Sequence, residues 1–316
     1  MKKIFVDGQE GTTGLKIHEY LSKRTDIEIL KIDPEKRKDP VERAKYLNES
    51  DISFLCLPDE GSRESVSLVK NNNTCIIDAS TAFRTNPEWT YGLPEMNKNQ
   101  RERISKSKRI CVPGCHATGF ISIVYPLVSS GIINPDYPLV CSSITGYSGG
   151  GKKLIAKFED IEKDKDYTNT PRHYALLANH KHLPEMKSIT GLAHYPAFTP
   201  IIGNFYKGMV VNVCLFPRLM NKKMNTADIR EFYKEYYDGE MFIDVKPFAD
   251  EKILKDGFLD PIECNGTNRL EFAVYGNDEQ IKIMTRFDNL GKGASGAAVQ
   301  NMNIVLGSPE DTGLVR

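Results

Sequence analysis

Short apolar runs alternate with amphipathic stretches through the first hundred residues of the chain. The apolar runs have the length and composition of buried strands, and the stretches between them have helical spacing. This alternation predicts an α/β fold with a Rossmann-like, doubly wound parallel sheet. The expected strands cover residues 3–6, 27–32, 52–57, 75–78 and 109–112, and the expected helices between them cover residues 12–24, 41–47 and 62–70.

After residue 140 the pattern changes to longer amphipathic strands, few of which alternate with helices. This texture is typical of an α+β domain with an antiparallel or mixed sheet. We therefore expect a dinucleotide-binding domain of residues 1–114 plus 291–316, and an α+β domain for catalysis and dimerisation of residues 115–290. The expected elements of the second half are strands at 138–145, 208–216, 270–275 and 280–287 and helices at 226–237 and 293–306.

Cys115 lies where the fifth expected strand gives way to an apolar helix. Pro113 and Gly114 end the strand, and the helical run that includes Phe120 follows at once. Unpaired N–H groups and the positive end of the helix dipole stabilise a thiolate in the first turn of a helix. The pattern therefore predicts that Cys115 is a nucleophile that attacks a carbonyl group.

Three glycines, Gly8, Gly11 and Gly14, are spaced three apart between the first expected strand and the first expected helix. At this position of a βαβ unit, a dinucleotide pyrophosphate meets the N–H groups of the helix. The spacing differs from Gly-x-Gly-x-x-Gly and indicates a variant turn. We expect the same turn to contact the cofactor through Thr12 and Thr13.

Charged residues follow the second expected strand. Asp33 occupies the position of an acid that would hold a ribose hydroxyl and so favour NAD. Lys36, Arg37 and Lys38 follow it and favour the 2′-phosphate of NADP, with a solvated turn as the alternative. Arg37 is the residue that we expect to contact the cofactor.

The loop after the fourth expected strand, residues 78–84, lies at the carboxyl edge of the sheet, where ligands bind. Ser80 is therefore a candidate for cofactor binding. Arg84 is a candidate for binding a phosphoryl group, because guanidinium groups bind such anions in a bidentate manner. A capped turn with no ligand is the alternative for both residues.

His180 and His182 are separated by one residue and are candidates for proton transfer near the cysteine. Glu185 is a candidate for orienting one of the two rings. No further His/Cys cluster with zinc spacing accompanies them in the sequence, so we expect no metal site. His116 is a weaker candidate, because adjacent residues of a helix point about 100° apart.

Lys plus Arg and Asp plus Glu each number 42, so the formal net charge is zero. A balanced chain lacks the basic field that attracts nucleic acid or an anionic membrane, and we expect neither partner. The seven cysteines have no Cys-x-x-Cys spacing, and the sequence shows neither a secretory leader nor an apolar stretch of membrane-spanning length. These features predict a cytoplasmic protein with free thiols.

Seven segments of the chain occur in an order that matches a known family. They are GQEGTTG at 8–14, DASTAFR at 78–84, YGLPE at 91–95, PGC at 113–115, GYSGGGK at 146–152, FYKGM at 205–209 and DNLGKG at 288–293. Together they resemble the short-form N-acetyl-γ-glutamyl-phosphate reductases, within the aspartate-semialdehyde dehydrogenase-like superfamily. The resemblance spans nearly the whole chain, and the PGC and GYSGGGK segments are its most specific parts.

The resemblance implies an NADP(H)-dependent enzyme that reduces a small acyl phosphate, N-acetyl-γ-glutamyl phosphate, to N-acetylglutamate 5-semialdehyde in arginine biosynthesis. It implies a thioester on Cys115 and an acid/base residue that is either His180 or His182. It also implies that Ser148 and Gly149 lie near the nicotinamide and that the protein is a homodimer or homotetramer. Asn289, in the glycine-rich segment 288–293, completes the expected cofactor contacts.

The chain departs from the family pattern on both sides of the cysteine. Val112 stands where the family usually has Asn, and His116-Ala117 stand where Tyr-Pro is common. The missing amide affects the expected rate and geometry more than the reaction type. A semialdehyde dehydrogenase of the aspartate or aminoadipate (lysine) pathway and a regulator that senses NADPH without turnover are the alternative functions.

Overall fold

The structure, a computed structural model, describes residues 1–160 and 169–316. These residues form two compact units. The first unit comprises residues 1–114 and 294–315, and the second comprises residues 115–293 with Arg316. Each unit has its own sheet, and the chain passes from one unit to the other between Gly114 and Cys115.

The first unit contains a six-stranded sheet in the order β2-β1-β3-β4-β6-β5, with every pair parallel. The predicted doubly wound parallel sheet is therefore confirmed. The sheet includes one strand, β5, that is too short to leave an alternating pattern in the sequence. The strands are β1 (Lys2–Asp7), β2 (Ile27–Leu30), β3 (Ile52–Leu55), β4 (Cys75–Asp78), β5 (Thr90–Tyr91) and β6 (Arg109–Cys111).

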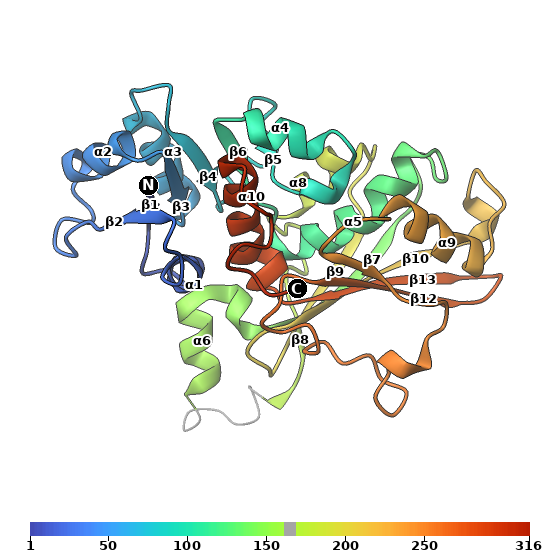
Figure 1. Cartoon of the computed structure of the whole chain (residues 1–316). Coiled ribbons are helices and arrows are strands. Elements are labelled where there is room, and N and C mark those ends of the chain that lie inside the picture. The colour runs from blue at the N-terminus through green and yellow to red at the C-terminus, as the bar shows by residue number, and fades with distance from the viewer. Residues whose placement is uncertain (161–168) are drawn as a thin grey trace. The chain divides into compact units, whose positions relative to one another are not determined.

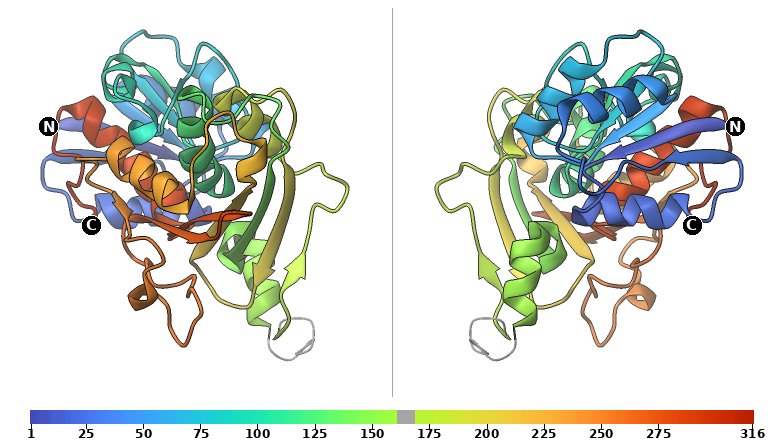
Figure 2. Two further views of the ribbon diagram at one scale, coloured as in Figure 1. Left: turned by 90° about the vertical axis from the view of Figure 1, so that its right-hand side faces the viewer. Right: turned by 90° about the vertical axis from the view of Figure 1, so that its left-hand side faces the viewer.

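Helices cover both faces of this sheet. Figure 2 shows α2 and α3 on one face and α1 with α10 on the other. The last helix of the chain belongs to this unit, because Ala298 and Met302 are buried with Ile4, Phe54 and Ile110 of the strands. The helices are α1 (Thr12–Leu21), α2 (Pro40–Glu49), α3 (Asp59–Leu68), α4 (Gln100–Lys106) and α10 (Gly296–Leu306), with a 3₁₀ turn at Pro94–Met96.

The second unit contains a seven-stranded mixed sheet in the order β11-β12-β13-β10-β7-β9-β8. The pairs β7–β9 and β11–β12 are parallel and the others are antiparallel, as the sequence pattern predicts for a mixed sheet. The strands are β7 (Val140–Gly146), β8 (Arg172–His173), β9 (Ala197–Gly203), β10 (Met209–Leu215), β11 (Ile243–Val245), β12 (Leu270–Gly276) and β13 (Ile281–Phe287). The helices are α5 (Cys115–Ser129), α6 (Gly151–Glu159), α8 (Leu183–Thr190) and α9 (Thr226–Tyr236).

Helix α5 lies directly on this sheet, with α8 packed beside it and α9 over β12 (Figure 1). Gly119 makes the close approach possible. A Cβ atom at this position would lie 2.6 Å from both Thr285 Oγ1 on β13 and Val211 Cγ2 on β10. Because α5 begins at Cys115, the packing of α5 fixes the position of the cysteine relative to the sheet.

Glycine is required at two positions of the turn between β1 and α1. Gly8 has a φ of +86°, and a Cβ atom there would lie 2.5 Å from the carbonyl oxygen of Cys56. A Cβ atom at Gly14 would lie 2.5 Å from the carbonyl oxygen of Gly8. The third glycine differs, because a Cβ atom at Gly11 would meet its nearest neighbours at an ordinary 3.5 Å.

These distances predict unequal effects of alanine on the stability of the first unit. Gly14→Ala forces helix α1 away from the turn, and we expect it to lower the free energy of unfolding by about 1–3 kcal/mol. Gly11→Ala is the matched control, because its φ of −71° suits alanine and its new methyl group has space. Urea unfolding of both variants measures the difference. Equal stability of the two variants would contradict the steric argument.

Candidate active site

Cys115 is the first residue of helix α5, as the sequence pattern predicts. Its side chain is partly exposed, and the thiol forms no disulfide. Gly293 borders it, since a Cβ atom at Gly293 would lie 3.0 Å from Cys115 Cβ. The thiol therefore combines partial solvent access with a position at the amino end of a 15-residue helix, which is the environment of a reactive cysteine.

Three histidines of the second unit gather into one cluster. The ring centroids of His180 and His182 are 4.7 Å apart, and the ring of His116 lies 5.4 Å and 5.6 Å from them respectively. Phe198 of β9 packs against the rings of His116 and His180. The sequence argument ranked His116 below the other two histidines. It considered only the direction of His116 relative to Cys115. It did not consider that the segment before α8, which carries His180 and His182, packs against His116.

His116 is also held by two hydroxyl groups. Its Nδ1 lies 2.7 Å from Ser143 Oγ on β7, and its Nε2 lies 2.7 Å from the Tyr174 hydroxyl. Neither Ser143 nor Tyr174 was identified from the sequence. The one signal for Ser143 was its position within an expected strand, and the loop that carries Tyr174 gave none.

Two of the three rings, those of His116 and His180, are electrically neutral at physiological pH. Burial lowers the pKa of His116 to about 3, and the charges of His180 and Lys181 contribute. Burial also lowers the pKa of His180 to about 4, with a further contribution from Lys181. His180 Nδ1 accepts a hydrogen bond from the His182 backbone N–H at 3.1 Å, so the proton of the neutral ring is on Nε2. His180 can therefore donate a hydrogen bond from Nε2.

Glu185 lies in the first turn of α8 and is 1% exposed. It is thus buried rather than a surface carboxylate, and it follows His182 by one helical turn. Among the described residues, no group of three or more His, Cys, Asp or Glu side chains is arranged to hold a metal ion.

The buried histidines predict a loss of stability in acid. An unfolded histidine has a pKa near 6.5, well above that of folded His116, so the unfolded chain binds more protons than the folded chain between about pH 6.5 and pH 3. The contribution is complete above pH 6.5 and falls as the pH falls. From pH 6.5 to 4.5, the burial of His116 alone should lower the free energy of unfolding by about 2 kcal/mol.

Chemical unfolding of the wild type and of His116→Asn at a series of pH values measures this effect. We expect a shallower pH dependence in the variant, since the carboxylates that also titrate in this range are common to both proteins. Parallel curves would show that His116 is not the source.

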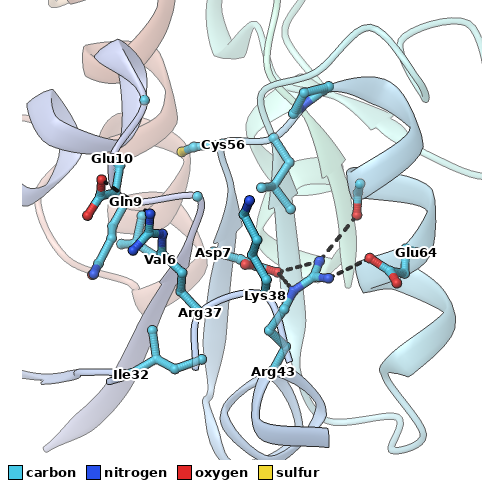
Figure 3. A pocket seen from close by; sticks show the side chains of 15 residues that line it. Val6, Asp7, Gln9, Glu10, Ile32, Arg37, Lys38, Arg43, Cys56 and Glu64 are labelled. Carbon is cyan, nitrogen blue, oxygen red and sulfur yellow. Dashed lines mark hydrogen bonds and ion pairs between the residues drawn. The ribbon is translucent and has the colours of Figure 1, made fainter. Parts of the chain in front are cut away.

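The first unit contains a separate cavity of about 500 Å³ at the carboxyl ends of β1 and β3. This is the point where the strand order reverses, which is the usual ligand site of a doubly wound sheet. Figure 3 shows Arg37 beside Gln9 and Glu10, and Arg43 between Asp7 and Glu64. The lining residues are Val6, Asp7, Gly8, Gln9, Glu10, Gly11, Ile32, Arg37, Lys38, Arg43, Cys56, Leu57, Pro58, Gly61 and Glu64.

The cavity includes some of the predicted cofactor residues and not others. Gly8, Gly11 and Arg37 line it. Thr12, Thr13 and Gly14 belong to the first turn of α1 and are not among the lining residues. Sequence reasoning did not select Arg43 or the segment 56–58 as cofactor contacts. It placed residues 56 and 57 inside the expected strand 52–57, whereas β3 ends at Leu55 and these residues follow it at the ligand edge of the sheet.

Ser80 is hydrogen-bonded within its own loop, and Arg84 joins that loop to the residue after β6. The Ser80 hydroxyl donates to Asp78 Oδ2 at 2.6 Å, and it accepts from the Ala82 N–H at 3.1 Å. Arg84 Nε donates to the Val112 carbonyl at 2.9 Å, and its Nη2 donates to the Ala79 carbonyl at 3.0 Å. These contacts match the alternative of a capped turn, and they hold the loop against the end of β6.

In the second unit the structure brings together Ser148, Gly149 and Asn289. Asn289 Nδ2 donates to Ser148 Oγ at 3.0 Å, and its Oδ1 accepts from the Gly208 N–H at 2.8 Å. A Cβ atom at Gly149 would lie 3.5 Å from Asn289 Nδ2. Three segments that the sequence analysis singled out separately thus meet at the amide of Asn289.

Known proteins resemble the chain over its whole length. N-acetyl-gamma-glutamyl-phosphate reductase 2 of Nostoc sp. is 47% identical to it, and the alignment covers 99% of both chains. The N-acetyl-gamma-glutamyl-phosphate reductase of Chelativorans sp. is 44% identical over 96% of this chain and 98% of its own. The chain belongs to the N-acetyl-γ-glutamyl-phosphate reductase family.

Two family models divide this reductase-family chain much as the structure does. Residues 3–105 match the semialdehyde dehydrogenase NAD binding domain, and residues 115–289 match the semialdehyde dehydrogenase dimerisation domain. The fold matches the solved aspartate semialdehyde dehydrogenase from Francisella tularensis with a TM-score of 0.72, at 15% identity over 97% of this chain and 100% of that one. Within residues 1–160 and 169–316, no helix has the length and apolar character needed to cross a membrane.

Proposed function

We propose that the chain catalyses the NADPH-dependent reduction of N-acetyl-γ-glutamyl phosphate to N-acetylglutamate 5-semialdehyde, with Cys115 as the nucleophile. The observation that carries the proposal is a partly exposed cysteine at the start of α5, next in sequence to a histidine whose ring packs against two others. The relatives at 47% and 44% identity, which align along their whole lengths, bear the name of this activity.

The cysteine performs the first chemical step of the proposal. The Cys115 thiolate attacks the acyl carbon, an S–C bond forms, and the C–O bond to phosphate breaks, which leaves a thioester and inorganic phosphate. Addition of hydride to the thioester carbon would give the anion of a thiohemiacetal. As the C=O bond re-forms, the S–C bond breaks, which releases the aldehyde and regenerates the thiolate without net uptake of a proton. The helix dipole of α5 favours the thiolate both as the attacking group and as the leaving group.

The histidine pair supplies a hydrogen-bond donor to the substrate. Because the pKa of His180 lies at about 4, its ring is neutral at working pH and donates a hydrogen bond from Nε2 rather than acting as an imidazolium. We assign hydrogen bonding to the acyl oxygen to the pair of His180 and His182.

The first unit fits a dinucleotide. Gly8 and Gly11 line its cavity without side chains, so a pyrophosphate can approach the backbone, and Arg37 and Lys38 supply positive charge. NADPH bound there supplies the hydride. We propose that Ser148, Gly149 and Asn289 of the second unit contact its nicotinamide end.

We further propose that the two units divide the work, with the first holding the cofactor and the second carrying catalysis and assembly. The match to a dimerisation domain indicates a homo-oligomer. On the seven-stranded sheet, alternate residues such as Ile144, Asn212 and Met284 are only partly buried, and they lie on the face away from α5. We propose this face as the interface of a homodimer, and light scattering of the purified protein tests it.

The reverse reaction tests the function. Purified protein is given phosphate, one aldehyde and one oxidised nicotinamide cofactor, and reduced cofactor is followed by its absorbance. We expect turnover with N-acetylglutamate 5-semialdehyde and NADP⁺. A preference for aspartate semialdehyde or the aminoadipate semialdehyde would identify the related dehydrogenases instead. Cofactor binding without turnover of any aldehyde would favour a regulator.

A further inference from the structure

The cofactor cavity of the first unit differs in charge from one side to the other. Figure 3 shows Arg37 and Glu10 on one side of Asp7, and Glu64 on the other side. Arg37 and its neighbour in sequence, Lys38, outnumber Glu10, so the first side has a formal net positive charge. This side suits the phosphate groups of the cofactor, which form charge-assisted hydrogen bonds with guanidinium and ammonium groups.

The second side is acidic because one buried arginine lies between two carboxylates. Arg43 Nη2 donates to Asp7 Oδ2 at 3.1 Å, and Arg43 Nη1 donates to Glu64 Oε2. Together these groups have a formal net negative charge, which repels a phosphate. Leu57 and Pro58, which directly precede α3, line the same cavity. The second side therefore suits an uncharged ring that can donate a hydrogen bond.

Glu64 has one carboxylate oxygen fixed and one available. Oε2 is bonded to Arg43, and among the described residues no donor bonds to Oε1. The side chain of Arg43 is only 7% exposed, and its Nη2 also donates to Ser65 Oγ at 2.6 Å, so it holds the carboxylate in one orientation. The Glu64 side chain is 49% exposed and lines the cavity, so a bound ligand can reach Oε1 as a hydrogen-bond acceptor.

We propose that Glu64 recognises the adenine of the cofactor: Oε1 accepts a hydrogen bond from the exocyclic amino group of the base, with Leu57 and Pro58 as apolar contacts of the ring. The proposal rests on the part of the proposed function that places NADPH in this cavity. Adenine and the 2′-phosphate are attached to the same ribose, so a phosphate at Arg37 and Lys38 brings the base into the same cavity. NADPH and NADH both contain adenine, so Glu64 contributes equally to the binding of both.

Glu64→Gln replaces the acceptor by a donor at the place that meets the base. Arginine can only donate, so the amide oxygen of the glutamine turns toward Arg43 and its NH₂ group takes the place of Oε1. Reduced nicotinamide hypoxanthine dinucleotide phosphate is the matching probe, because hypoxanthine has a carbonyl oxygen where adenine has its amino group. The two cofactors carry the same phosphates, so the loss of a charge at residue 64 affects both alike. Only a contact with the base can exchange their order of affinity.

Fluorescence titration of the purified protein with each reduced cofactor gives the two Kd values without any turnover. We expect the wild type to bind NADPH about tenfold more tightly than the hypoxanthine cofactor, because a hydrogen bond to a charged acceptor is lost. We expect Glu64→Gln to reverse the order and to bind the hypoxanthine cofactor about threefold more tightly than NADPH. Equal Kd values in the wild type, or a variant that still prefers NADPH, would overturn the adenine contact.

Glu60→Gln is the matched control for this reversal. Glu60 is in the first turn of the same helix and loses the same charge, but it is outside the cavity lining. We expect it to keep the wild-type order and ratio, and a reversal in this variant as well would overturn the assignment to Glu64. A protein that shows the reversal at Glu64 but turns over no aldehyde would contradict the proposed catalysis and leave the adenine contact in place.

Discussion

Replacement of Cys115 by serine is expected to lower kcat by at least about 10³-fold while leaving the binding of NADPH unchanged. A serine hydroxyl stays protonated at neutral pH, and the dipole of α5 is not strong enough to ionise it. NADPH binding should persist because the cavity of the first unit is built without residue 115. Steady-state kinetics and cofactor fluorescence measure the two quantities.

Cys214→Ser is the matched control for this experiment. Cys214 is a second partly buried free thiol of the same unit, on β10, and has no place in the proposed chemistry. We expect its kcat to stay close to that of the wild type. Mass spectrometry after incubation with acyl phosphate, without NADPH, should find an acyl group on Cys115. A Cys115→Ser variant that retains a tenth of the activity or more would refute the covalent route.

Much of the fold could be predicted from the sequence because the buried strands leave a strong pattern. Strands β1, β3 and β4 are almost wholly buried, and each gave a continuous apolar run. Strand β9 gave none, because its first three residues are exposed or only partly buried and the fourth is Pro200. Strands of two or three residues, such as β8 and β11, are too short for any periodicity to appear.

The candidate site was predictable only where a residue sits at the end of a regular element. Cys115 and Gly8 follow predicted strands, so their positions could be inferred. The meeting of His116 with Tyr174 could not, since it depends on the pairing of β8 with β9 and on the packing of α5 against α8. These are contacts between segments about 60 residues apart, and no local pattern specifies them.

The resemblance implies NADP(H), whereas the charged residues after the second expected strand left NADP and NAD both open. The charges around the cavity of the first unit narrow that choice. Asp33 is not among its lining residues, and one of its oxygens accepts from the Glu35 N–H at 3.0 Å in a local turn. Arg43 lines the cavity, but its guanidinium is bonded to Asp7 and Glu64. Neither residue therefore determines whether NADP or NAD binds.

Arg37 and Lys38 are the cations of this cavity that are left to meet a 2′-phosphate. Arg37 donates to the Pro34 carbonyl at 2.7 Å through Nη1, and its Nη2 stays 4.0 Å from Glu10. A neighbouring acid at that distance and exposure weakens the charge only slightly. The guanidinium and the Lys38 ammonium are thus placed to bind a phosphate with charge-assisted hydrogen bonds.

The double variant Arg37→Ala/Lys38→Ala should therefore raise KM for NADPH about 100-fold and leave KM for NADH within about threefold. Each lost contact with a doubly charged phosphate is expected to weaken binding by about 1.4 kcal/mol, or roughly tenfold. Lys36→Ala removes a charge of the same sign from the same turn but outside the cavity lining, so it should change neither constant. Because NADH lacks the 2′-phosphate, an equal loss for both cofactors would mean that the two residues support the cavity wall instead of reading the phosphate.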